Sequence, residues 1–149
     1  MAESIIIHFN ERNPAAIIGR LEARFGVSDR QAWRFPADDY LICVRPYSCE
    51  DLDAEYDAAE REDIRTQLAG PPTASFDFEI RRSGSDDACD LLERFVRVDL
   101  QGLTFVVDDM WRLISCKDLE GITDFLDCYR NKKLADHLPS LSKLSANSG

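Results

Sequence analysis

Apolar residues in the first half of the chain follow the spacings of a strand, a helix and two further strands. The β-branched segment SIIIHFN, at 4–10, favours a strand. In the segment 13–26, Asn13 can cap a helix, Pro14 suits its first position and Gly26 can end it. The apolar face of this helix consists of Ile17, Ile18, Leu21 and Phe25. Two strands, QAWRF and YLICVRPY, are predicted next, joined by the turn-forming PADD.

The second half of the chain shows the same order of patterns. SFDFEIRR, at 75–82, alternates as a half-buried strand does, with an inner face of Phe76, Phe78 and Ile80. A helix capped by Ser85 is predicted over 85–102, with a core face of Ala88, Leu91, Leu92 and Phe95. Two short strands are expected around Asp108 and Asp109. A last helix over 115–130 has an apolar face of Leu119, Ile122, Phe125, Leu126 and Tyr129.

This order, βαββα followed by βαββα, predicts an α+β domain built from two similar halves. The offsets between matching positions agree, because Ile5 to Phe76 is 71 residues and Pro14 to Asp86 is 72. We therefore expect a single α+β domain over 1–130, with halves at about 3–70 and 74–130. Its helices should cover one face of an antiparallel or mixed sheet. Residues 131–149, which contain Ser and Lys, are expected to form a C-terminal tail.

Negative charge is concentrated between Asp38 and Asp63. Ten carboxylates and two arginines, Arg45 and Arg61, give this segment a net charge of −8, whereas the whole chain carries −10. The other 123 residues therefore share only −2. The segment can enter a helix at Ser48, with Asp51 three residues later, or at Asp57, with Glu60 three residues later, and both pairs have capping-box spacing.

Composition excludes several classes of protein. An acidic pI near 4.6 argues against binding to nucleic acids and to anionic membranes, because both need clustered Lys and Arg. The N-terminus lacks the features of a signal peptide, and no stretch has the roughly 20 apolar residues of a membrane span. Five cysteines without a CxxC pair suit free thiols, so we expect a cytoplasmic location. No spacing of His and Cys indicates a metal site, and no cofactor is expected.

Candidate catalytic groups are few, and each has a simpler structural explanation. Asp108 and Asp109 could serve as paired carboxylates, but Asp is also common in hairpin turns. Cys116 stands beside Lys117, which could activate the thiol, but neither histidine is placed in sequence to act as a base. No nucleophile and base can be assembled with any specificity, so we do not expect an enzyme.

The acidic segment has two interpretations, which the sequence leaves open. It is either a solvated helix face or a binding surface. The second is favoured by the scarcity of Lys and Arg within the run, since i,i+4 ion pairs cannot then account for it. Crowded like charges also cost stability through self-repulsion.

In size, acidity and layout, the chain resembles the immunity proteins that protect bacteria from polymorphic or contact-dependent toxins. The likeness covers residues 3–130 and includes the successive segments SFDFEIRRSGSDDACDLLERF and FVVDDMWRLIS. The resemblance implies that the protein docks on a cognate toxin, whose active-site cleft is basic if it acts on nucleic acid. The expected toxin-binding residues are the acidic run with two aromatic anchors: Asp38, Asp39, Tyr47, Glu50, Asp51, Asp53, Glu55, Tyr56, Asp57 and Glu60.

A second interpretation is a module that binds small molecules. The repeated strand–helix–strand–strand unit is similar to the layout of gyrase-inhibitor-like ligand-binding domains, in which a cleft lies between the two units. That resemblance implies a cleft lined by Trp33 and Trp111, which occupy related places in the two halves.

Overall fold

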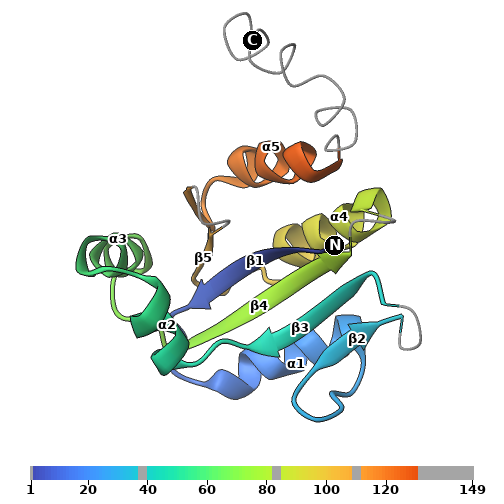
Figure 1. Cartoon of the computed structure of the whole chain (residues 1–149), viewed down its shortest axis with the longest axis horizontal. Coiled ribbons are helices and arrows are strands. Elements are labelled where there is room, and N and C mark those ends of the chain that lie inside the picture. The colour runs from blue at the N-terminus through green and yellow to red at the C-terminus, as the bar shows by residue number, and fades with distance from the viewer. Residues whose placement is uncertain (1, 37–39, 82–84, 109–111, 131–149) are drawn as a thin grey trace, which may run out of the picture.

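A computed structural model describes residues 2–36, 40–81, 85–108 and 112–130 of the chain. These residues form one six-stranded sheet and its covering helices (Figure 1). The strands are β1 (Ala2–Phe9), β2 (Trp33–Phe35), β3 (Ile42–Pro46), β4 (Ala74–Arg81), β5 (Phe105–Asp108) and β6 (Leu113–Ser115). The helices are α1 (Pro14–Phe25), α2 (Cys49–Glu55), α3 (Ala58–Leu68), α4 (Ser85–Arg94), a π-helical turn η1 (Phe95–Asp99) and α5 (Leu119–Arg130). The predicted α+β class is confirmed.

All neighbouring strands of the sheet are antiparallel, and their order is β2-β3-β4-β1-β5-β6. The longest strands, β1 and β4, form its centre, where Ile5 pairs with Phe78 and Ile7 with Phe76. The first hairpin joins β4 through its second strand, β3, whereas the second hairpin joins β1 through its first strand, β5. The two halves thus differ in strand order, and the first ends in two helices, α2 and α3, where the second ends in α5 alone.

Local signals in the sequence set the ends of α1. The side chain of Asn13 accepts a hydrogen bond from the backbone N–H of Ala15, Pro14 opens the helix, and Gly26 closes it with a φ of 87°. A glycine suits this last position because a side chain is strained at such a φ. The buried residues Ile17, Leu21 and Phe25 then place the apolar face of α1 on the sheet.

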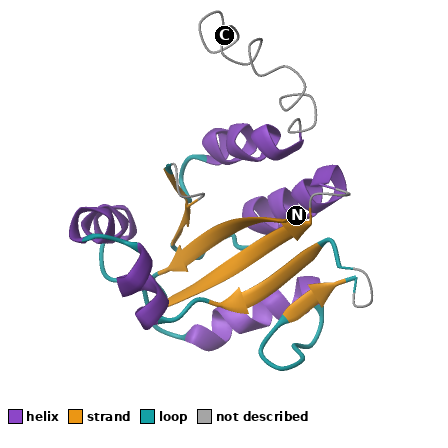
Figure 2. Cartoon of the chain, in the orientation of Figure 1, coloured by secondary structure: helices purple, strands orange, loops and turns teal. Residues whose placement is uncertain are grey.

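Most of the apolar core lies on one face of the sheet. It joins strand residues such as Ile7 and Phe78 to α1, α4, η1 and α5. In Figure 2 the strands form the orange centre of the domain, and helices surround it. The aromatic rings of Phe25 and Phe95 are 5.0 Å apart between centroids, so α1 and η1 meet over the sheet. This contact ties the two halves into one core.

The expectation that the helices cover a single face was wrong, because α3 packs on the opposite one. Ile64 and Leu68 of α3 form a second buried cluster with Tyr56 and Val106. Successive residues of β5 therefore serve different layers: Phe105 and Val107 face the main core, and Val106 faces α3. Figure 1 shows α2 and α3 together at the left, beside the arrowheads of β1 and β3.

Candidate functional site

The acidic segment contains both of the alternative helix starts, one after the other. Ser48 opens α2: its hydroxyl accepts a hydrogen bond from the backbone N–H of Asp51 (3.0 Å), and the Asp51 carboxylate accepts one from the N–H of Ser48 (3.1 Å). Asp57 opens α3 by the same exchange with Glu60, at 2.8 and 2.9 Å. Three carboxylates of the run, Asp51, Asp57 and Glu60, therefore stabilise helix ends as well as adding charge.

All eight carboxylates of α2, α3 and their caps are exposed to solvent. We call this set the acidic surface: Glu50, Asp51, Asp53, Glu55, Asp57, Glu60, Glu62 and Asp63. Two arginines, Arg61 and Arg65, stand among them, which leaves a net charge of −6. Arg61 donates to the backbone carbonyl of Tyr56 (2.6 Å), and Arg65 forms an exposed ion pair with Glu62 (3.7 Å). The surface is therefore strongly anionic.

Several carboxylates of α4, η1 and α5 form ion pairs with arginines. Arg130 of α5 binds Asp90 (2.8 Å), Asp127 (2.7 Å) and Glu93. Arg24 of α1 makes two hydrogen bonds to Asp99, at 2.5 and 3.0 Å. Paired charges of this kind fix the packing of helices. On the acidic surface, by contrast, eight exposed carboxylates on adjacent helices stand beside two arginines, one of which donates to a backbone carbonyl.

The structure brings six of the predicted toxin-binding residues together on this surface, namely Glu50, Asp51, Asp53, Glu55, Asp57 and Glu60. Asp38 and Asp39 lie outside the described residues. Tyr47 is half-buried, and its hydroxyl donates to the backbone carbonyl of Asp51 at 3.3 Å. Tyr56 is only 4% exposed, so the expectation of an exposed anchor was wrong there. The ring of Tyr56 packs in the second core cluster, and its hydroxyl donates a hydrogen bond to buried Asp108 on β5.

A chain of buried hydrogen bonds lies beneath the acidic surface. His8 of β1 is fully buried; its Nδ1 lies 2.7 Å from the hydroxyl of Ser75 on β4, and its Nε2 lies 3.2 Å from the hydroxyl of Tyr56. The Tyr56 hydroxyl donates to Oδ2 of Asp108 on β5. One assignment satisfies every bond: Ser75 donates to Nδ1, and the Nε2–H donates to Tyr56. This polar chain joins three strands to the segment between α2 and α3.

Burial sets the protonation of this polar chain. Desolvation lowers the pKa of His8 from 6.5 to about 4, so the imidazole is neutral at pH 7. Burial, and then the hydrogen bond to Asp108, raise the pKa of Tyr56. The polar chain is therefore made of neutral donors that end on a carboxyl acceptor. The strand alternation contained a signal for it, since His8 falls on the face of β1 opposite Ile7 and Phe9.

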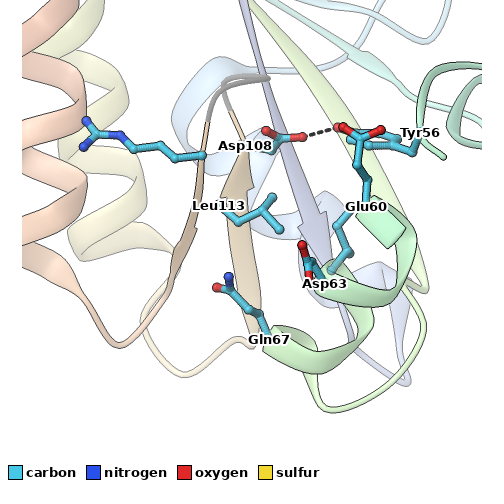
Figure 3. Close-up of a pocket in the computed structure, with 8 residues that line it drawn as sticks. Tyr56, Glu60, Asp63, Gln67, Asp108 and Leu113 are labelled. Carbon is cyan, nitrogen blue, oxygen red and sulfur yellow. Dashed lines mark hydrogen bonds between the residues drawn. The ribbon is translucent and has the colours of Figure 1, made fainter. Parts of the chain in front are cut away.

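A pocket of about 290 Å³ opens between α3 and the β5–β6 hairpin. It is lined by Tyr56, Glu60, Asp63, Ile64, Gln67, Asp108, Arg112 and Leu113. Figure 3 shows Glu60, Asp63 and Gln67 along α3, with Leu113 across from them and the hydrogen bond between Asp108 and Tyr56 at one end. Three carboxyl groups line the pocket, so its chemistry suits a cationic guest.

Arg112 is the basic residue of the pocket lining, and its guanidinium contacts an aromatic ring of α5. It lies over the ring of Phe125, 5.4 Å from the centroid, in a cation–π contact. Phe125 belongs to α5 and to the main core, and it does not line the pocket. The positive charge of Arg112 is therefore held beside α5.

Other sequence candidates do not converge on a site. Trp33 is 4% exposed and packs edge-on against Phe76 (6.1 Å between centroids), so it is a core residue and not the wall of a cleft. Trp111 and Asp109 lie outside the described residues. Cys116, the candidate thiol beside Lys117, is half-buried and packs against the main core. Within the described ranges, no three His, Cys, Asp or Glu side chains are grouped so that they could hold a metal ion.

Comparisons with known proteins add no relative. No protein-family model, curated protein or solved structure matches the chain. In the part of the chain that the structure describes, no helix has the length and apolar character needed to cross a membrane. The activity of the protein therefore has to be inferred from its own surface chemistry.

Proposed function

We propose that this protein is an inhibitor of the immunity-protein type, which binds a basic protein partner, a toxin, through the acidic surface. One observation carries the proposal: eight exposed carboxylates stand on two adjacent short helices, offset by two arginines. A patch of one sign steers a partner of the opposite sign and raises its association rate, by roughly 10- to 1,000-fold at low salt.

Helix capping explains only part of this acidity. The carboxylates of Asp51, Asp57 and Glu60 have capping bonds, but the other five of the eight carboxylates lie outside the two capping boxes. Crowding them together costs stability through repulsion, so a solvated face alone gives no reason for it. A binding role explains the crowding, because a cationic partner relieves the repulsion between the carboxylates when it binds.

Binding would inhibit the partner by covering its active-site cleft. If the toxin acts on nucleic acid, its cleft is basic, and the carboxylates of the acidic surface can occupy the positions of phosphates. Close charge pairs that lose their water at such interfaces have coupling energies of about 1.5–7 kcal/mol, whereas exposed pairs contribute about 0.2–1 kcal/mol. Half-buried Tyr47, beside α2, supplies an aromatic contact at the edge of the surface.

The test is an association rate, measured with a partner captured from the organism that encodes the chain. The double substitution Glu50→Gln and Asp53→Asn removes two of the eight charges and leaves both capping boxes intact. A proportional share of the steering effect predicts association about two- to sixfold slower at low salt. The matched control is Glu120→Gln with Asp124→Asn, two exposed residues of α5 that change the net charge equally.

The proposal requires that the control bind at nearly the wild-type rate. It also requires that the double variant protect cells that produce the captured partner less well than the wild-type protein does at the same limiting dose. Equal slowing of both variants would mean that only total charge matters. In that case the acidic surface is a solvated face.

A further inference from the structure

We infer that the pocket between α3 and the β5–β6 hairpin receives one basic side chain, an arginine or a lysine, of the protein partner. The inference rests on the proposed function and adds a specific site to it. The acidic surface provides long-range attraction, and the pocket provides the place where one cation of the partner is held. Glu60 and Asp63 belong to both, because they are exposed on α3 and also line the pocket.

The size of the pocket favours a single side chain. Its volume of about 290 Å³ lies at the lower limit of sites for drug-sized ligands, which span roughly 300–1,000 Å³. A nucleotide or a large cofactor would extend well beyond it. The pocket is partly open to solvent, so a side chain can enter while its own backbone stays outside.

The lining matches the two parts of a long basic side chain. Ile64 of α3 and Leu113 of β6 supply apolar walls for the methylene stem. Glu60 and Asp63 supply charge at the exposed rim, and the buried carboxyl group of Asp108, 3% exposed, supplies an acceptor further in. A guanidinium carries five N–H donors and so can use several of these oxygens together.

The inner end of the pocket is held in place before any partner arrives. Tyr56 donates to Asp108, and His8 with Ser75 fixes the Tyr56 hydroxyl from behind. A partner therefore does not have to order these groups when it binds, which reduces the cost of association. The buried polar chain thus holds the Asp108 carboxyl group in position at the inner end of the pocket.

The test uses a small probe in place of the partner. N-acetyl-arginine amide is titrated into the ¹⁵N-labelled protein, and its neutral isostere N-acetyl-citrulline amide is the control ligand. The inference predicts amide shifts with arginine that centre on Ile64, Gln67 and Leu113, with affinity in the millimolar range. It predicts no saturable shifts there with citrulline. Shifts spread evenly along α2 and α3, or equal shifts with citrulline, would overturn it.

Two matched substitutions separate the pocket from the general charge. Asp63→Asn removes a carboxylate from the pocket lining, whereas Asp53→Asn removes an equally exposed one from α2. Affinity for the arginine probe should fall about two- to fivefold in the first variant, the range for one exposed ion pair, and change little in the second. Glu60→Gln provides a second pocket variant, because glutamine retains the capping box. Equal losses in the Asp63 and Asp53 variants would overturn the inference.

The two proposals fail in different experiments. If the probe does not bind in the pocket but the partner still associates more slowly with the Glu50→Gln, Asp53→Asn variant, only the pocket is refuted. If the partner's association is insensitive to the acidic surface, the proposed function is refuted whatever the probe does. The inference about the partner's side chain is then overturned with it.

Discussion

His8 makes the stability of the fold depend on pH. In the folded protein its pKa is about 4, because burial disfavours the imidazolium, and in the unfolded chain it returns to 6.5. Between about pH 6.5 and pH 4, His8 is therefore mostly protonated in the unfolded state and mostly neutral in the folded state. The free energy of unfolding should fall as the pH drops from about 6.5 to about 4, and this contribution should level off below that range.

The size of the effect follows from the shift. A difference of about 2.5 pKa units corresponds to a full loss of about 3 kcal/mol, since each unit is worth about 1.4 kcal/mol. Between pH 7.5 and pH 5, linkage gives a loss of about 2 kcal/mol from this one residue. That loss is a large fraction of the roughly 5–15 kcal/mol that stabilises a typical domain.

The assay is urea unfolding at pH 7.5 and at pH 5, for the wild-type protein and for His8→Gln. Glutamine can still form hydrogen bonds at this buried position but does not titrate, so its variant isolates the imidazole. The carboxylates near His8, Asp108 among them, are present in both proteins and cancel in the difference. The wild-type protein should lose about 2 kcal/mol more than the variant between the two pH values.

An equal loss in the two proteins would refute this reasoning. So would an NMR titration in which the His8 ring shows a pKa near the usual value for an exposed imidazole. Either result would mean that water reaches the side chain, and that the hydrogen bonds to Ser75 and Tyr56 do not hold it in a dry site.

Three further predictions concern stability, each measured by chemical denaturation. Tyr56→Phe should cost at least about 2 kcal/mol, because it leaves two buried hydrogen-bonding partners without their group. Asp57→Ala should cost about 1 kcal/mol by removing the N-cap of α3, whereas Asp53→Ala, at an exposed position within α2, should change stability little. Phe95→Ala should cost about 3–5 kcal/mol, because the ring is fully buried between α1 and the sheet.

Features set by neighbouring residues could be predicted from the sequence. The ends of α1 followed from Asn13, Pro14 and Gly26, each of which acts within its own turn. The acidic segment was harder, because Ser48 and Asp57 each offer a complete capping box. Both are used, since Tyr56 adopts an extended backbone between α2 and α3 and ends the first helix.

The buried polar chain and the pocket beside it could not be predicted, because they depend on contacts between distant residues. Tyr56 is 48 residues from His8 and 52 from Asp108, and only the strand order places β1 beside β5. Alternation along β1 indicated which face His8 occupies, but not that α3 covers that face. Tyr56 was therefore expected at the surface, as an aromatic anchor, although the structure buries it.

Carboxyl footprinting of the protein with and without its captured partner tests the central claim most directly. A carbodiimide labels exposed carboxylates, and mass spectrometry reports the extent at each residue. The account predicts that Glu50, Asp53 and Glu55 lose most of their labelling in the complex, while Glu120 and Asp124 on α5 keep theirs. Unchanged labelling of α2 and α3 in a complex that does form would contradict it.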